Sequence, residues 1–284
     1  DYLSSFMKIV TLLAAFLVLV ISSNYLKTLK IFKIEYPILI LSSVLGMMIM
    51  ISSNDLIVFY MGLELQSLAL YVLATFNRDQ LKSSEAGLKY FVLSALSSGL
   101  LLYGCSLIYG FTGSTNFNII ANQLNSNEYS ITFGIVFILV GLAFKISAVP
   151  FHMWAPDVYE GAPTPVTTLL AAASKAMGFI AVFRVFVFTL DSVSEDWELV
   201  IGIVALASMT LGNLAAISQN DVGRMLAFSS IGQAGYIMIA IPALTNEAMS
   251  GAIAHTLVHA FMKGGAFVVV GCVGAAGLGY SLDS

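Results

Sequence analysis

The chain has 284 residues, of which 58% are hydrophobic and only 10% are charged, and its formal net charge at pH 7 is −4. Its mean hydropathy of +0.91 excludes a soluble globular domain of this length. Apolar runs of about 20 residues recur along the sequence, and this is the length that a helix needs to cross a bilayer core about 30 Å thick. The short alternating segments of a transmembrane barrel are not seen. The composition therefore predicts an all-α, polytopic membrane protein.

Nine membrane spans are predicted in chain order, at about residues 3–23, 37–53, 55–76, 86–110, 131–149, 165–190, 197–217, 223–241 and 249–277. The sequence starts at Asp1 without an initiator Met, shows no charged, cleavable leader, and stops abruptly at residues 281–284. We therefore expect an internal piece of a longer protein rather than a secretory precursor.

The connections between the spans sort by charge. The connections after spans one, three and seven carry Lys27, Lys30, Lys33, Arg78, Lys82 and Arg224. The opposite connections carry Asp55, Glu128, Asp191, Glu195, Asp196 and Glu247. The positive-inside rule places the first set on the cytoplasmic side of the inner membrane and residue 1 on the outer side. One helix more or fewer would destroy this sorting, which supports the span count.

The third span has a carboxylate near its middle, Glu64, followed by Gln66 and Ser67. An ionisable group near the bilayer centre costs at least about 2.5 to 3.5 kcal/mol, so such groups persist where they are paired or line a polar path. We expect Glu64 to belong to an ion pair that titrates. The alternative is a protonated carboxyl that is hydrogen-bonded between helices.

The fifth span carries Lys145 near its end, followed by Pro150 and His152. Proline removes an amide donor and clashes with the preceding turn, so it should break the helix. A broken helix inside a membrane is tolerated where it borders protein or a water-filled cavity, and it is typical of transport sites. The alternative is that Pro150 ends the span and His152 begins a surface loop.

The sixth span places Lys175 directly after three alanines and Ser174. Small residues allow close helix contact, and the resulting low dielectric favours a neutral amine, as a reversible proton carrier requires. The Pro- and Gly-rich turn before this span should hold the helix ends rigidly, and we interpret its acids, Asp157 and Glu160, as structural. Arg184, later in the same span, is expected to pair with a helix end or another subunit.

The ninth span presents His255, His259 and Lys263 at intervals of four residues, so that all three share one helix face. A proton relay is favoured over a zinc site, because lysine is a poor metal ligand and neither Cys nor a carboxylate accompanies the two histidines. The two cysteines, Cys105 and Cys272, are predicted to be small buried residues inside helices.

Several segments together carry a family resemblance. They are Gly62-Leu63-Glu64-Leu65, Phe144-Lys145, Pro150-Phe151-His152, Pro156-Asp157-Val158-Tyr159-Glu160-Gly161-Ala162-Pro163, Ser174-Lys175 and Arg224-Met225-Leu226-Ala227-Phe228-Ser229-Ser230. With them the chain resembles the antiporter-like membrane subunits of proton-pumping NADH:quinone oxidoreductase, complex I, over nearly its whole length. The run from Pro156 to Pro163 resembles the N-type rather than the L- and M-types. The spacing of the histidines and Lys263 resembles the L- and M-types and the subunits of multisubunit cation/proton antiporters.

The resemblance implies a fourteen-helix subunit built from two inverted five-helix repeats, each with one broken helix. Nine of about fourteen helices would be present in a single membrane domain over 1–284, with the first repeat at 37–190, its break near 145–152, and the start of the second repeat at 197–284. It also implies site roles. Glu64 would pair with Lys145, Lys175 would be the central relay lysine, and His152 would lie near the break. Lys89 matches another family lysine, although it could equally be a snorkelling residue at the membrane edge.

The expected function is proton translocation along the residues Glu64, Lys145, Lys175, His259 and Lys263, driven by separation of the Glu64–Lys145 pair. The sequence has no nucleotide-binding glycine loop, CxxC, haem or iron–sulfur pattern, so we expect no cofactor in this chain and place quinone and redox centres in other subunits. The expected partners are other membrane-arm subunits, the lipid bilayer and protons, without nucleic acid. Two alternatives remain: a subunit of a cation/proton antiporter or membrane-bound hydrogenase, and a structural anchor, which would not need buried lysines.

Overall fold

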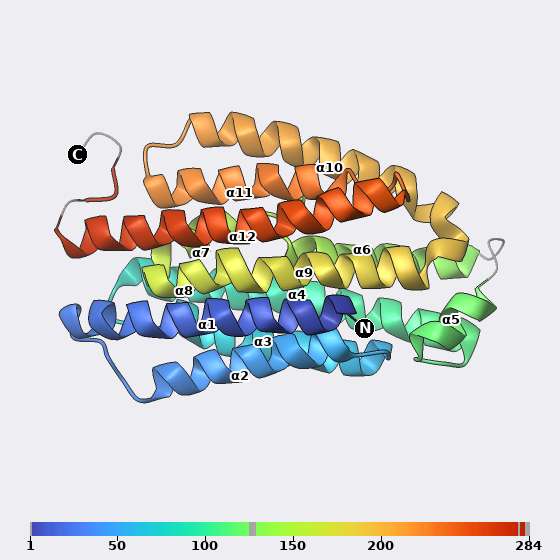
Figure 1. Cartoon of the computed structure of the whole chain (residues 1–284), viewed down its shortest axis with the longest axis horizontal. Coiled ribbons are helices and arrows are strands. Elements are labelled where there is room, and N and C mark those ends of the chain that lie inside the picture. The colour runs from blue at the N-terminus through green and yellow to red at the C-terminus, as the bar shows by residue number, and fades with distance from the viewer. Residues whose placement is uncertain (1, 125–128, 278, 282–284) are drawn as a thin grey trace.

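The computed structural model describes residues 2–124, 129–277 and 279–281 of the chain, and their long helices lie side by side along one axis (Figure 1). Asp1, Glu128 and the last three residues, which entered the predictions above, lie outside the described residues. The loops with the predicted cytoplasmic lysines and arginines are all at one end, on the left in Figure 1.

The first half of the chain contains α1 (Tyr2–Thr28), α2 (Glu35–Ser52), α3 (Leu56–Ala74), α4 (Leu81–Thr112), α5 (Phe117–Gln123) and α6 (Tyr129–Lys145). The second half contains α7 (Trp154–Gly161), α8 (Thr164–Leu169), α9 (Lys175–Val182), α10 (Ser194–Ile217), α11 (Val222–Met238) and α12 (Asn246–Ala275). Wider π-helical turns join α8 to α9 (η1, Leu170–Ser174) and follow α9 (η2, Phe183–Thr189), and a short 3₁₀ turn (η3, Asp191–Val193) precedes α10.

Each of the nine predicted spans coincides with a helix among the described residues. Seven of these helical segments are long and apolar enough to cross a membrane. The other two, α6 and α11, have 17 residues each. The all-α, multi-pass membrane fold is therefore confirmed. One expectation is wrong: Cys105 is buried, but Cys272 is exposed on α12.

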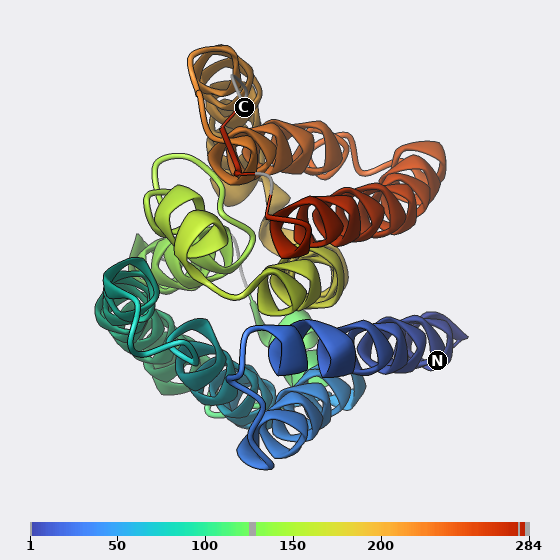
Figure 2. The ribbon, with the colours of Figure 1, turned by 90° about the vertical axis from the view of Figure 1, so that its left-hand side faces the viewer.

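The segment from α8 through η2 forms the centre of the bundle. In the most apolar stretch of Thr164–Thr189, 89% of the residues are buried, whereas the share is 28% in α1 and in the segment Asp191–Ile217. The view along the helices shows this segment enclosed by α1, α7 and α12 (Figure 2). A lysine on this segment is therefore shielded from lipid by protein on every side.

Helix starts are fixed by polar caps. The Asp55 carboxylate accepts hydrogen bonds from the amides of Ile57 (2.8 Å) and Val58 (3.1 Å) at the start of α3. Asp221 accepts from the amide of Arg224 (2.9 Å) at the start of α11. Because the first amides of a helix have no partner in the helix and carry partial positive charge, a carboxylate there stabilises the start of each span.

Glycines bring antiparallel neighbours into backbone contact. In the hairpin of α10 and α11, a Cβ on Gly212 would lie 2.8 Å from the Cα of Gly232 and 3.0 Å from the carbonyl oxygen of Phe228. Gly46 and Gly62 play the same part between α2 and α3, where a Cβ on Gly46 would lie 2.7 Å from the Gly62 carbonyl oxygen. In membranes, such small residues allow the close packing that holds helices together.

An ionic network closes the end of the bundle that carries the basic loops. Asp157 pairs with Lys89 (2.7 Å) and Arg224 (2.6 Å), while Glu160 pairs with Lys82 (2.6 Å) and Arg224 (3.0 Å). The network ties α7 to α4 and to α11. Burial alone would raise the pKa of both carboxyls, but the hydrogen bonds from their cationic partners lower it below the ordinary values.

We expect Gly212→Ala to destabilise the protein by about 1 to 3 kcal/mol, because the added methyl group overlaps backbone atoms of α11. Gly202→Ala is the matched control in the same helix, since a Cβ there meets no atom within 4 Å. Thermal unfolding of the purified protein in detergent should show a lower midpoint for the first variant only. Equal midpoints for the two variants would refute the close contact.

The lowered pKa of Asp157 gives a second prediction. Its ion pairs should contribute about 1 kcal/mol at neutral pH, a modest value because the groups are partly exposed. This stability is present above the ordinary carboxyl pKa of 3.8 and is lost as the pH falls through the lower pKa of the folded state. Asp157→Asn should therefore unfold more easily than the parent at pH 7, and the difference should vanish in acid. A difference that grows in acid contradicts the assignment.

Candidate functional site

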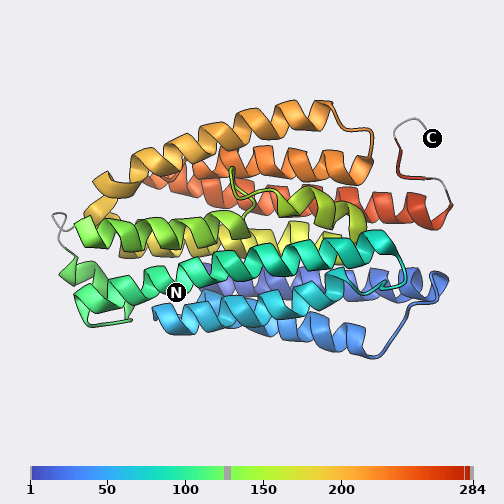
Figure 3. The ribbon, with the colours of Figure 1, turned by 180° about the vertical axis from the view of Figure 1, so that it is seen from behind.

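The interruption between α6 and α7 creates the first part of the site. α6 ends at Lys145 and α7 begins at Trp154, so residues 146–153 are not helical (Figure 3). Ser147 has a positive φ of 59°, which is uncommon for a non-glycine residue. The amide of Ala148 donates to the carbonyl of Ala143 (2.8 Å), and the Trp154 indole donates to the carbonyl of Phe144 (2.9 Å). These bonds satisfy carbonyls that the interrupted helix leaves free.

Lys145 lies at the carboxyl end of this half-helix, where the helix dipole stabilises a positive charge. Its side chain is only 5% exposed, and its Nζ donates to the hydroxyl of Ser67 on α3 (2.8 Å). A Cβ on Gly178 of α9 would lie 3.6 Å from the Lys145 Cγ and 2.8 Å from a methyl group of Ile146. The absence of a side chain at position 178 therefore lets α9 approach the break.

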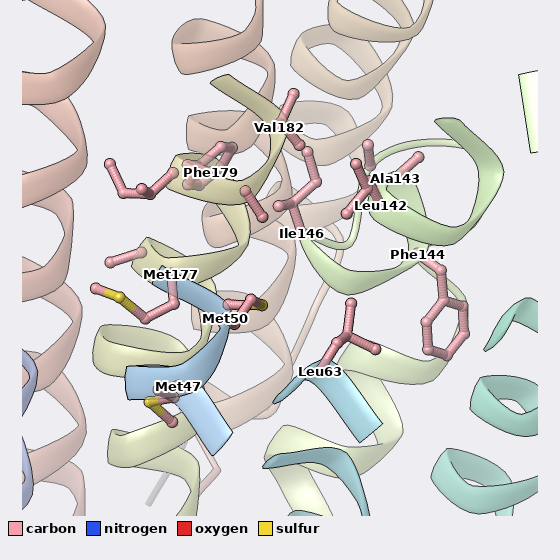
Figure 4. Close-up of a cluster of buried hydrophobic side chains, with 14 of the residues drawn as sticks. Met47, Met50, Leu63, Leu142, Ala143, Phe144, Ile146, Met177, Phe179 and Val182 are labelled. Carbon is pink, nitrogen blue, oxygen red and sulfur yellow. The ribbon is translucent and has the colours of Figure 1, made fainter. Parts of the chain in front are cut away.

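Apolar side chains surround the break. Figure 4 shows Ile146 between Leu142 of α6 and the α9 residues Phe179 and Val182, while Phe144 points away from them. All five are buried. Lys145 lies between two of these residues in the chain, Phe144 and Ile146. In such a low-dielectric setting its hydroxyl partner is worth more than it would be in water.

Glu64 has a different partner from the one that the family resemblance implied. Its Oε1 accepts a short hydrogen bond from the Ser98 hydroxyl (2.5 Å), and Ser98 is also hydrogen-bonded to Tyr60 (3.1 Å). In the described part of the chain, Glu64 and Lys145 form no direct ion pair, although the charge of Glu64 still acts on Lys145. The structure thus has this acid and this amine separated, each held by its own serine.

Two adjacent residues of α3 connect the surroundings of Lys145 with those of Lys175. Ser67 accepts the Lys145 hydrogen bond, and the Gln66 side-chain amide donates to the hydroxyl of Ser174 (2.6 Å), which directly precedes Lys175. The Gln66 Oε1 is buried and has no partner among the described residues. A buried acceptor of this kind suits a bound water.

Lys175 follows the π-helical turn η1, Leu170–Ser174, where a regular helix was expected. π-Turns are rare and often lie at functional sites, because they widen the helix and re-aim the side chains that follow. Lys175 is 2% exposed, and its Nζ donates to both the hydroxyl (2.7 Å) and the carbonyl (3.0 Å) of Ser230 on α11. The run of small residues before Lys175 was the only sequence signal for this geometry.

Neighbouring serines of α11 hold the remaining groups. The Ser230 hydroxyl also contacts the Nε2 of His259 (3.2 Å) on α12. Lys263 donates to the hydroxyl of Ser229 (2.8 Å) and to the carbonyl of Leu226 (3.3 Å). The Ser229–Ser230 pair, recognised in the sequence only as part of a family motif, therefore joins two lysines and a histidine.

The other predicted site residues lie outside the hydrogen bonds that hold Lys145, Lys175, His259 and Lys263. His255 is hydrogen-bonded to Gln233 (2.7 Å), one helical turn from His259. His152 lies in the break, with its Nδ1 buried and without a partner among the described residues. Lys89 is paired with Glu85 and Asp157, both at 2.7 Å, so it belongs to the ionic network. Arg184 donates to the Ile51 and Ser53 carbonyls at the end of α2, as expected of a residue that pairs with a helix end.

The site as a whole is a polar row that runs sideways through the bundle, from α4 through α3, α6, α9 and α11 to α12. It contains the groups Glu64, Lys145, Lys175, His259 and Lys263. Among the described residues, the three lysines have hydroxyl and carbonyl partners instead of carboxylates. Such a row can pass protons between amines through hydroxyls and water. The described residues contain no group of three or more His, Cys, Asp or Glu side chains that could hold a metal ion.

Comparisons with known proteins agree with this architecture. A family model described as "NADH:quinone oxidoreductase/Mrp antiporter, TM" matches residues 53–278. The chain is 61% identical over 263 residues to the NADH-quinone oxidoreductase subunit N of Pelagibacter ubique, and the match covers 93% of this chain and 56% of that protein.

Solved structures are similar as well. A chain of respiratory complex I from Thermus thermophilus with bound aureothin matches with a TM-score of 0.78 and 33% identity, covering 95% of this chain and 57% of the other. A chain of the archaeal membrane-bound sulfane sulfur reductase matches with a TM-score of 0.80 and 32% identity, covering 87% and 51%. The chain thus spans about half the length of the proteins that it matches. It belongs to the family of transmembrane subunits shared by NADH:quinone oxidoreductases and Mrp antiporters.

Proposed function

We propose that this chain is part of an N-type, proton-translocating membrane subunit of a respiratory NADH:quinone oxidoreductase. The observation that carries the proposal is the row of buried lysines, each held by a serine hydroxyl in the interior of the bundle. The 61% identity to a relative named subunit N supports this reading over an antiporter or hydrogenase subunit.

In the proposed cycle, the distance between Glu64 and Lys145 controls the charge of Lys145. When the two groups approach, the carboxylate stabilises the ammonium, and when they separate, as in this structure, the buried ammonium loses its counter-ion. The proton then moves toward Lys175 through water and the hydroxyls of Ser67 and Ser174, while the Gln66 side-chain amide holds Ser174 in place by its hydrogen bond. A neighbouring subunit would supply the change that moves the pair.

The second step passes the proton from Lys175 to Lys263. Ser230 contacts both Lys175 and His259, so one hydroxyl can accept a proton on one side while donating on the other. Lys263 lies one helical turn beyond His259 and is held by Ser229. His255 and His152 are assigned supporting places beside the row, and Lys89 a place in the network at the end of the bundle.

The proposal also covers location and partners. We place the protein in the cytoplasmic membrane of a bacterium, with the basic loops in the cytoplasm and residue 1 on the outer side. Its partners would be other membrane-arm subunits, lipid and protons, without nucleic acid. No redox cofactor is assigned to this chain, and the quinone and redox centres would belong to other subunits.

Replacing Lys175 by Ala, or Glu64 by Gln, should reduce NADH-driven proton pumping by about a hundredfold or more, because each variant removes a titrating group from the relay. The complex should still assemble, as judged by native gel electrophoresis of detergent-solubilised membranes. Lys8→Ala is the control, since it replaces a lysine of a membrane helix outside the row. Normal pumping in both relay variants would contradict the proposed function.

Ser230→Ala should slow pumping by about threefold to tenfold, the effect of losing one hydrogen-bonding hydroxyl. Ser230→Thr keeps the hydroxyl and should retain most of the rate. Proton uptake by inverted membrane vesicles, followed with a pH-sensitive dye, measures both. If the two variants lose the same share of the rate, the hydroxyl has no part in the transfer.

A further inference from the structure

A polar cavity opens between the helix ends on the side that carries the basic loops. Its volume is about 260 Å³, and its wall includes Tyr159, Asn77, Gln80, Glu160 and Asp221. A water molecule occupies about 30 Å³ in the liquid, so the cavity has room for several waters with polar partners. The ends of α7, α8 and α12 surround it, and this face is turned toward the viewer in Figure 2.

Tyr159 of α7 is one of the residues that line this cavity. Its hydroxyl is buried and makes no hydrogen bond to any described residue. Its helix, α7, packs against α11, which carries Ser230, and its ring contacts Phe267 of α12, one turn after Lys263. Ser230 is the residue that holds both Lys175 and His259. A buried hydroxyl without a partner is costly, so this one calls for a water or for a partner supplied during turnover.

The ring of Tyr159 is fixed in place, so its hydroxyl has a defined position. It packs edge-on against Trp154 (6.2 Å between ring centroids) and Phe267 (5.5 Å). The flanking acids Asp157 and Glu160 anchor the same short helix through ion pairs with Arg224. A rigid ring with a mobile hydroxyl proton is well suited to connect water on one side with a serine on the other.

We propose that Tyr159 is the proton-uptake residue that links the cytoplasmic-side cavity to Lys175 through Ser230. The hydroxyl of Tyr159 takes a proton from a cavity water as it gives its own to Ser230, and Ser230 gives its proton to the neutral amine of Lys175. Both hydroxyls end unchanged, and Lys175 gains one proton. This inference rests on the proposed function, in which Lys175 is a relay group.

Tyr159→Phe tests the inference in the intact complex, because the ring and its packing remain while the hydroxyl is lost. Tyr90→Phe is the matched control. Tyr90 also has a buried hydroxyl without a partner and stacks on Trp154 at 4.5 Å, but it lies on α4 and does not line the cavity. In inverted membrane vesicles, whose cytoplasmic face is outside, NADH-driven proton uptake is measured from about pH 6 to about pH 8.

Tyr159→Phe should pump about threefold to tenfold more slowly near pH 8, and the deficit should shrink near pH 6, where more protons are available to the slowed uptake step. Tyr90→Phe should match the parent throughout. The inference is overturned if Tyr159→Phe pumps normally, if its deficit is independent of pH, or if both tyrosine variants lose rate equally. Lys175→Ala, measured in parallel, distinguishes failure of the proposed function from failure of the uptake route. Normal pumping by Lys175→Ala refutes the proposed function. A loss of pumping in Lys175→Ala together with normal pumping by Tyr159→Phe refutes only the uptake route.

Discussion

Three lysine amines are buried without a carboxylate partner among the described residues, and this is the constraint on which the rest of the structure depends. An unpaired ammonium in hydrocarbon is costly, and its cost is reduced where polar groups replace the hydration shell. Here serine hydroxyls take that place at Lys145, Lys175 and Lys263. A neutral hydroxyl offsets part of the cost of burying a charge, but it does not neutralise the charge as a carboxylate would. A strong carboxylate pair would hold the proton in place.

The backbone departs from the regular α-helix at the two central lysines. Lys145 is the last residue of α6 before the break, and Lys175 is the first residue after the π-turn η1. In a membrane, irregular backbone is tolerated only where protein or enclosed water satisfies the freed groups. The central position of α8 and α9, away from lipid, meets this requirement. The two irregularities therefore lie in the part of the bundle that can accommodate them.

Much of the fold was predictable from the sequence, because membrane spans follow from length and hydropathy alone. The break after Lys145 was predictable from Pro150, and a helix end was one of the two partners expected for Arg184, the other being another subunit. The π-turn was not predictable, since a run of alanines fits an α-helix equally well. Nor was the separation of Glu64 from Lys145, because it depends on Ser98, a distant residue on α4 with no signal of its own.

For the site, too, the sequence predicted which residue types matter but not which partners they would have. Residue type predicted a functional role for Glu64, Lys175 and Lys263, since ionisable groups inside membrane spans are costly and are rarely retained without a role. Residue type could not distinguish Lys89, which belongs to the ionic network, from the lysines of the polar row. A lysine near a helix end can either snorkel to the membrane edge or join a polar row. The partners that decide between these outcomes come from helices far apart in the chain.

The short helix α7 connects the break beside Lys145 with the ionic network at the end of the bundle. At its start, the Trp154 indole is bonded to the Phe144 carbonyl beside Lys145, and near its end Asp157 and Glu160 are bound to α4 and α11. Because α11 also carries Ser229 and Ser230, a shift of α11 relative to α4 would change the lysine row and strain the ion pairs of α7 together. Partly exposed ion pairs contribute about 1 kcal/mol or less each, so the network can hold α7 in register and still yield to such a shift. A set of weak bonds at the surface is therefore compatible with movement at the buried amines, whereas a large apolar interface at the same place would oppose it.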